Sequence, residues 1–205
     1  MDLADFKKLP VMGILRGIKP DSIEALVETV VASGLKTIEI TMNTEGADKI
    51  IKEAVRAAGG QLTIGAGTVL NEKALKAALD SGATFIVMPS LIGDVVKYCV
   101  KRKIPVFPGA FTPQEIYNAW NAGASMVKVF PSGFFGPGYF KEIKGPFNEI
   151  ELMACGGVRP ENIKSYFSNG ASAVAFGASV FQKEWLSNKD FSSIGNRIKE
   201  YLREI

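Results

Sequence analysis

Apolar and polar residues alternate along the chain with two periods, one typical of helices and one typical of strands. One apolar stripe follows Pro20-Asp21 at i, i+3, i+4, i+7 and i+8 spacing and predicts an amphipathic helix; its members are Ile23, Leu26, Val27, Val30 and Val31. Thr112-Pro113-Gln114-Glu115 has the composition of a helix start, with a cap, a first-turn proline and a glutamate at the third position. Short β-branched segments follow such helices after turns that contain glycine.

This helix-and-strand unit repeats about every 23 residues. The clearest turns lie at Gly34, Gly82, Gly123 and Gly170, and less regular ones lie at Gly59-Gly60, Lys103 and Pro146. Strands are expected near residues 10–15, 36–41, 61–66, 84–88, 105–107, 125–130, 150–155 and 172–176. Eight units of about 26 residues fill the 205-residue chain and close naturally as a small α/β TIM barrel, (β/α)8. A doubly wound open sheet has the same alternation and is the structural alternative.

No change of composition marks a linker, so residues 1–205 are expected to form a single domain. With 47% hydrophobic and 22% charged residues, the chain has the balance of a soluble globular protein. It contains no histidine and two cysteines, Cys99 and Cys155. The missing histidine excludes Ser-His-Asp and Cys-His catalysis and every imidazole metal site. Acid–base chemistry must come from Glu, Asp, Lys, Tyr or a lone Cys, and no metal or cofactor is expected.

Charge and hydropathy argue against two classes of partner, nucleic acids and membranes. The 24 basic and 21 acidic residues are dispersed, with no basic run longer than Lys101-Arg102-Lys103, so nucleic acid is not an expected partner. Residues 1–10 carry four charges and no apolar run, unlike a signal peptide. The longest uncharged run, residues 165–182, is too polar to span a bilayer. These features favour a cytoplasmic protein without a membrane partner.

Lys128 and Glu39 are charged residues in the middle of apolar strands. Alternation places Val127 and Val129 under the helices, which directs Lys128 into the barrel, and Glu39 is directed inward in the same way between Ile38 and Ile40. One interpretation is structural: a buried ion pair, or exposed positions on an edge strand. The other is catalytic, since burial that lowers the pKa of a lysine yields a neutral amine that attacks carbonyl carbon, with the glutamate moving protons.

Glycine-rich segments follow three of the predicted strands, at the end where barrel active sites form. They are residues 65–68, 156–158 and 177–179. The last two follow the seventh and eighth predicted strands, where TIM barrels commonly bind phosphate through backbone N–H groups; plain turns are the alternative. Arg16 ends the first strand and is a candidate for binding a carboxylate or phosphate, or else a surface residue.

Five segments in their order along the chain resemble the KDPG/KHG aldolases, the 2-keto-3-deoxy-6-phosphogluconate and 4-hydroxy-2-oxoglutarate aldolases. They are Ile14-Leu15-Arg16-Gly17, Ile38-Glu39-Ile40-Thr41, Gly65-Ala66-Gly67-Thr68-Val69-Leu70, Val127-Lys128-Val129-Phe130-Pro131-Ser132 and Gly156-Gly157-Val158. The resemblance covers essentially the whole chain. It implies a TIM barrel, commonly a homotrimer, with metal-free class I chemistry. The enzyme would cleave a 2-keto-3-deoxy-6-phospho sugar acid or 4-hydroxy-2-oxoglutarate to pyruvate and an aldehyde, glyceraldehyde 3-phosphate or glyoxylate.

The resemblance also implies a role for each matching residue. Lys128 would form the Schiff base and Glu39 would be the general acid and base. At the pyruvate end, Arg16 and Thr68 would hold the carboxylate, and Pro89 and Phe130 would wall the methyl group. The residues that would cradle the distal phosphate are Gly156, Gly157, Gly177 and Ser179.

Two positions depart from the family pattern. Many members have arginine where this chain has Asn43, so carboxylate binding would rest more on Arg16. Gluconate-type members typically have threonine at the position of Cys155, and galactonate-type relatives have an aliphatic residue, so Cys155 would select the C4 epimer; core packing is its other interpretation. Two further hypotheses stay open: a phosphosugar epimerase or isomerase on the same barrel, and a non-catalytic sugar-phosphate binding protein.

Overall fold

A computed structural model describes residues 1–205, and its strands form one parallel sheet. The strands are β1 (Val11–Leu15), β2 (Thr37–Thr41), β3 (Thr63–Gly67), β4 (Ile86–Val87), β5 (Val106–Phe107), β6 (Gly109–Ala110), β7 (Val127–Val129), β8 (Leu152–Cys155) and β9 (Ala173–Phe176). Their order in the sheet is β5-β4-β3-β2-β1-β9-β8-β7-β6. Since Pro108 alone separates β5 from β6, the two ends of this order are halves of one strand, and the sheet closes as the predicted barrel.

The fifth barrel strand is longer than the predicted range of 105–107. Its first half pairs with the strand before it, and its second half pairs with the strand after it. β5 pairs with β4 before Pro108, and β6 pairs with β7 after it. Pro108 has no N–H to donate, and its carbonyl accepts the hydrogen bond from the Lys128 N–H at 2.9 Å. Pairing thus passes from one neighbour to the other at Pro108 and joins Lys128 to this strand.

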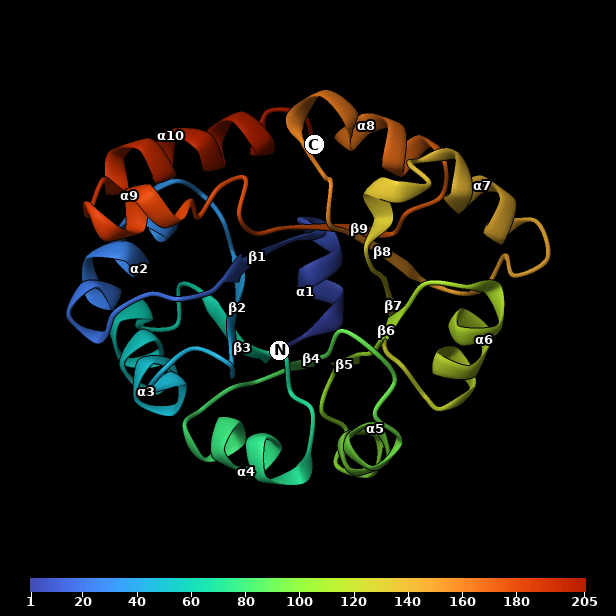
Figure 1. The fold of residues 1–205 in the computed structure, drawn as a ribbon, viewed down its shortest axis with the longest axis horizontal. Coiled ribbons are helices and arrows are strands. Elements are labelled where there is room, and N and C mark those ends of the chain that lie inside the picture. The colour runs from blue at the N-terminus through green and yellow to red at the C-terminus, as the bar shows by residue number, and fades with distance from the viewer.

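A ring of helices surrounds the barrel in Figure 1. The α-helices are α1 (Leu3–Lys8), α2 (Ile23–Ala32), α3 (Ala47–Ala58), α4 (Glu72–Asp80), α5 (Gly93–Lys101), α6 (Pro113–Asn121), α7 (Gly138–Lys144), α8 (Pro160–Ser168), α9 (Lys183–Ser187) and α10 (Phe191–Leu202). Two short 3-10 turns, η1 (Pro20–Ser22) and η2 (Ser132–Phe134), precede α2 and α7. None of these helices has the length and apolar character needed to cross a membrane.

The predicted helix signals are confirmed in α2 and α6. The stripe of α2 is buried from Ile23 to Val30, and Val31 packs at its edge. At the start of α6 the Thr112 hydroxyl accepts from the Glu115 N–H, and the Glu115 carboxylate accepts from the Thr112 N–H at 2.8 Å. This reciprocal capping box satisfies N–H groups that have no partner within the helix.

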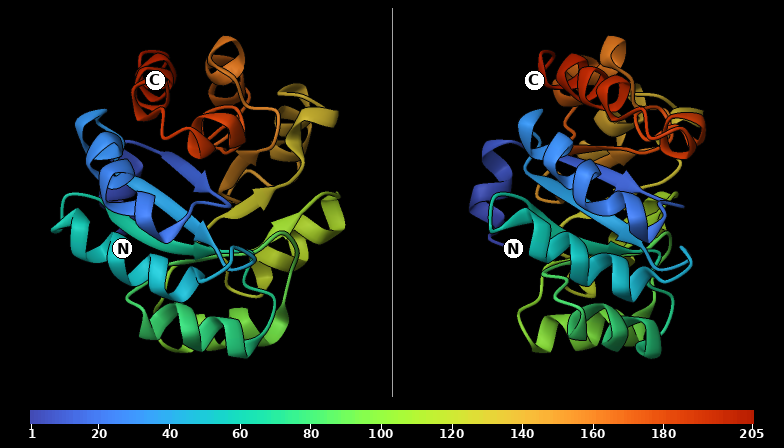
Figure 2. Two further views of the ribbon diagram at one scale, coloured as in Figure 1. Left: turned by 60° about the vertical axis from the view of Figure 1, so that its left-hand side comes forward. Right: turned by 90° about the vertical axis from the view of Figure 1, so that its left-hand side faces the viewer.

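Helix α1 was not predicted from the sequence, and it closes the barrel at the N-terminal end of the strands (Figure 2). Asp2 caps it by accepting from the Ala4 N–H at 2.7 Å. Phe6 is buried and meets the Phe107 ring edge-on, with ring centroids 6.1 Å apart. Only one residue of this six-residue helix is buried and its pattern is too short to show a period, so the helix is stabilised by this tertiary contact.

The core has two layers that match the alternation of the strands. Ile38, Ile40, Val127 and Val129 belong to the cluster between barrel and helices, as predicted. Met126 belongs to the smaller cluster inside the barrel. Strand period therefore decided correctly which side chains point inward.

Candidate active site

A cavity of about 570 Å³ opens at the carboxyl ends of the strands. The predicted site residues that line it are Arg16, Thr68, Pro89, Lys128, Phe130, Cys155, Gly156 and Gly177. A smaller adjoining cavity of about 240 Å³ shares the last two and adds Gly157 and Ser179. Asn43 is exposed and lines neither cavity.

Lys128 and Glu39 meet inside the barrel, although they come from strands β7 and β2. Lys128 Nζ lies 3.6 Å from Glu39 Oε1, and the two residues are 6% and 1% exposed. The second carboxylate oxygen, Oε2, is buried without a hydrogen-bond partner. A purely structural ion pair satisfies its buried oxygens with hydrogen bonds. The 3.6 Å separation and the unpartnered Oε2 therefore favour a catalytic role for the pair.

Protonation of this pair differs from the sequence prediction in one respect. Burial is the largest single influence and disfavours the Lys128 ammonium, but Glu39 and Cys155 together favour it more, so the pKa of Lys128 is raised rather than lowered. Burial also raises the pKa of Glu39 against the pull of Lys128. A neutral amine therefore arises when Glu39 takes the lysine's proton, which its raised pKa facilitates.

Gly67 leaves the space that the Glu39 carboxyl group occupies. Glu39 pairs in register with Gly65 of β3. Gly67 lies two residues further along β3, on the same face of the strand as Gly65. A Cβ on Gly67 would lie 2.6 Å from both Cδ and Oε1 of Glu39. The second glycine of the 65–68 segment is thus required by packing against Glu39 rather than by a turn.

The residues predicted to hold the carboxylate and the methyl group of pyruvate line the larger cavity. The backbone of Thr68 has φ +55°, a left-handed conformation that is unusual for a β-branched residue, and it lies where β3 ends at the cavity. Phe130 is partly exposed, with its ring centroid 5.6 Å from Lys128 Nζ. Cys155 is buried, and burial raises the pKa of its thiol, so Cys155 is uncharged beside Lys128.

A buried hydroxyl network fixes the loop that carries Arg16. The Gly17 N–H donates to Thr44 Oγ1 at 3.0 Å, and Thr44 Oγ1 lies 3.1 Å from Thr41 Oγ1. Because Thr41 ends β2, this network ties the β1 loop to the neighbouring strand. Arg16 forms no ion pair within the chain, which leaves its guanidinium free for an anion.

Two glycine-containing loops form the smaller cavity. Gly156 and Gly157 have φ near +85°, and a Cβ on Gly157 would lie 2.7 Å from the Gly133 Cα. Ser132 supports the first loop by donating to the Gly156 carbonyl at 2.8 Å. Backbone N–H groups at such loops suit a phosphate or carboxylate.

The structure adds cationic residues that the sequence did not single out. Lys19 and Lys183 line the larger cavity, and Arg159 lines the smaller one. None of the residues that line either cavity is acidic. Arg159 could have been found from its place directly after Gly156-Gly157-Val158, whereas Lys19 and Lys183 resemble any surface lysine until the fold brings them to the cavity mouth.

A barrel with a buried lysine–glutamate pair under a cationic cavity has the architecture of a class I aldolase, which forms a Schiff base with its substrate. The family model "KDPG and KHG aldolase" matches residues 3–197. The chain belongs to this family, and it is an aldolase that releases pyruvate and an aldehyde by cleaving a carbon–carbon bond. This confirms the resemblance noted in the sequence and excludes the epimerase and binding-protein hypotheses.

Individual relatives agree in sequence and in structure. The chain is 36% identical over 176 residues to 2-dehydro-3-deoxy-6-phosphogalactonate aldolase of Escherichia coli strain K12, covering 85% of this chain and 86% of the relative. It is 33% identical over 202 residues to 2-dehydro-3-deoxy-phosphogluconate aldolase of Haemophilus influenzae, covering 98% of this chain and 93% of the relative.

Solved structures share the fold. A structure described as native KDPGal superposes with a TM-score of 0.89 at 32% identity, covering 96% of this chain and 94% of that chain. A designed porous protein cage, built by fusing symmetric oligomeric domains, contains a similar fold, with a TM-score of 0.89 at 32% identity over 96% of this chain and 72% of the cage chain.

Proposed function

We propose that this aldolase cleaves a 2-keto-3-deoxy-6-phospho sugar acid with Lys128 as the Schiff-base residue and Glu39 as the proton carrier. The observation that carries the proposal is the buried pair, 3.6 Å apart, with Lys128 in the wall of a cavity lined by cations. A substrate with a carboxylate at one end and a phosphate at the other matches the two anion-binding regions, near Arg16 and near Gly157.

Schiff-base formation begins with transfer of the Lys128 proton to Glu39. The neutral amine then adds to the C2 carbonyl carbon, and a proton of the resulting ammonium nitrogen passes to the former carbonyl oxygen, which becomes a hydroxyl group. Glu39 returns its proton to that hydroxyl, which leaves as water and produces a protonated imine. The orphaned Oε2 of Glu39 supplies the free oxygen that this shuttle requires.

Cleavage uses the same two residues. Glu39, through a water molecule, takes the proton of the C4 hydroxyl, and the C3–C4 bond breaks. Its electrons move into the imine to form an enamine, while C4 leaves as the aldehyde. Glu39 then protonates C3, and water releases pyruvate from Lys128. Pro89 and Phe130 would wall the pyruvate methyl, and Arg16 and Thr68 would hold its carboxylate.

The galactonate-type epimer is the proposed main substrate. Support comes from the 36% identity to the galactonate-type relative and from Cys155, a buried weak hydrogen-bond donor beside Lys128. The test is cleavage of both C4 epimers, with pyruvate release as the readout. Cys155→Thr should shift the preference about tenfold toward the gluconate type, and an unchanged preference would remove Cys155 as the selector.

Trapping of the imine tests the catalytic assignment. Incubation with pyruvate and borohydride should give a stable mass increase of one reduced pyruvate on the intact protein. Lys128→Ala should abolish the adduct, and Lys97→Ala, at an exposed lysine of α5, should retain it. An adduct that persists in Lys128→Ala would overturn the role of Lys128.

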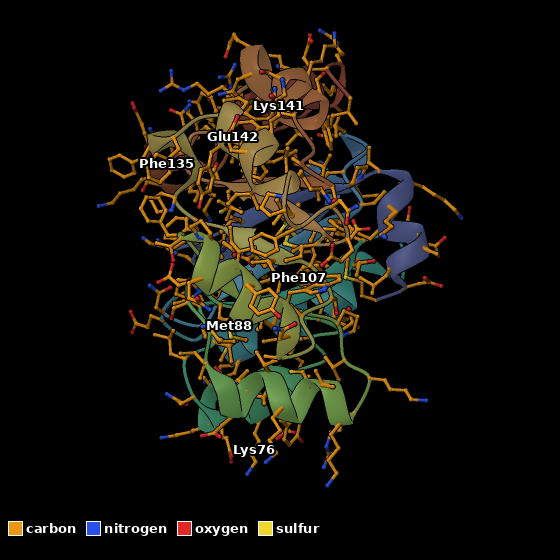
Figure 3. All side chains as sticks on the ribbon, turned by 90° about the vertical axis from the view of Figure 1, so that its right-hand side faces the viewer. Lys76, Met88, Phe107, Phe135, Lys141 and Glu142 are labelled. Carbon is orange, nitrogen blue, oxygen red and sulfur yellow. The ribbon has the colours of Figure 1, made fainter.

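A homotrimer is the proposed assembly. An aromatic patch of Phe111, Phe134, Phe135 and Tyr139 stacks on the surface, with Phe134 81% and Phe135 56% exposed. In Figure 3, Phe135 lies at the edge of the molecule opposite α1, whereas Phe107 lies inside. Exposed apolar patches of this kind favour association. Light scattering should give the trimer mass for the native chain and a smaller mass for the Phe134→Ser/Phe135→Ser variant; a native monomer would refute the assembly.

A further inference from the structure

Tyr201 of α10 reaches from the last helix into the two loops that form the smaller cavity. It is fully buried, and its ring centroid lies 4.6 Å from that of Phe176 at the end of β9. The residue does not line either cavity, and no motif in the sequence marked it. Its hydroxyl group is therefore placed behind the anion-binding surface rather than on it.

The Tyr201 hydroxyl contacts one group from each loop. It lies 2.7 Å from Ser179 Oγ, in the loop after β9, and 3.1 Å from the carbonyl oxygen of Val158, in the loop after β8. A phenol carries one proton, so it donates to one of these partners at a time. The Val158 carbonyl can only accept, so when Tyr201 donates to it, the 2.7 Å contact remains a hydrogen bond only if the Ser179 hydroxyl donates to Tyr201.

These contacts define two hydrogen-bond arrangements. In the first, Tyr201 donates to Val158 and the Ser179 hydroxyl donates to Tyr201, so Ser179 offers no proton to the cavity. In the second, Tyr201 donates to Ser179, whose proton then points to an anion in the smaller cavity. A donor chain that ends on a negative charge is strengthened along its length. Burial raises the pKa of Tyr201, so the phenol keeps the proton that the chain needs.

We propose that Tyr201 is a positioning residue for the distal anion, acting by turning the Ser179 hydroxyl toward the substrate phosphate. This inference rests on the proposed function, since it requires a phosphate or a comparable anion in the smaller cavity. Tyr201 also couples the site to helix α10, because it lies on the buried face of that helix.

The experiment compares Tyr201→Phe with the native chain on two substrates, the 6-phospho sugar acid and the same 2-keto-3-deoxy sugar acid without its phosphate. Tyr201→Phe keeps the ring that packs on Phe176 and removes only the hydroxyl. KM for the phosphorylated substrate should rise about tenfold with kcat nearly unchanged, because one hydrogen bond to a charged acceptor is weakened. Constants for the unphosphorylated sugar acid should stay the same, since its distal end carries no anion.

Two controls separate positioning from general destabilisation. Tyr98→Phe removes a hydroxyl on α5, across the barrel from α10 in Figure 1, and should change neither KM. In a Ser179→Ala background, Tyr201→Phe should have little further effect, because its route to the phosphate is already lost. Equal losses on both substrates, or a full additional loss in Ser179→Ala, would overturn the proposal. A native chain that leaves the phosphorylated substrate uncleaved would instead overturn the proposed function.

Discussion

Gly67→Ala tests whether the position of the Glu39 carboxyl group is as tightly set as the structure indicates. The added Cβ would lie 2.6 Å from Glu39 Cδ and Oε1, whereas ordinary contact begins at 3.4 Å. Gly67 does not have a positive φ, so an alanine meets no backbone strain, and the whole effect comes from this contact. The carboxyl group must therefore move by about 0.8 Å in a closely packed interior.

A shift of that size acts on both stability and rate. Overpacking of this kind costs about 1–3 kcal/mol of unfolding free energy. Displacing a catalytic group by nearly 1 Å costs on the order of a hundredfold in kcat. Urea unfolding measures the first effect, and pyruvate release together with the rate of borohydride trapping measures the second.

The matched control for this variant is Gly93→Ala. Gly93 begins α5, and a Cβ there has no heavy atom within 4 Å, so kcat should be unchanged and the stability should not fall, because alanine favours a helix over glycine. Adding Glu39→Asp to Gly67→Ala shortens the crowded side chain and should recover stability without recovering kcat. A Gly67→Ala enzyme with native stability and kcat would refute the inference that Glu39 is held in one position.

Three further predictions address other parts of the molecule. Glu39 must be ionised to accept protons and burial raises its pKa, so kcat/KM should fall as the pH falls through a value above 4.5; an acid limb at or below 4.5 would contradict this. Thr44→Val removes the acceptor of the Gly17 N–H and should raise the KM for pyruvate in the trapping reaction several-fold. Thr44→Ser keeps the hydroxyl group and should have the native KM. Equal KM values for both variants would show that the network does not position Arg16. Phe6→Ala should lower the unfolding free energy, measured in urea, by about 3–5 kcal/mol. The value of kcat at 25 °C should be unchanged, because α1 lies at the opposite end of the barrel from the cavity. An unchanged midpoint of urea unfolding would refute the role of Phe6 in closing the barrel.

The strands and the side-chain directions could be predicted because they depend on local order. A period of two assigns faces within one strand, so Lys128 and Glu39 were placed inside the barrel before any strand was paired. The same reasoning failed for α1, whose six residues have too short a pattern to show a period. It also shortened the fifth strand, because the proline at position 108 hides the continuation of pairing with a different neighbour.

The sequence by itself determined the fold class, the family and the chemistry available, since a chain without histidine must use amine and carboxylate groups. Only the tertiary structure decided the 3.6 Å contact between Lys128 and Glu39, the raised pKa of the lysine, and the link from Tyr201 to Ser179. Each of these joins residues far apart in the chain. Their distances depend on how every strand pairs as the barrel closes, which no local pattern contains.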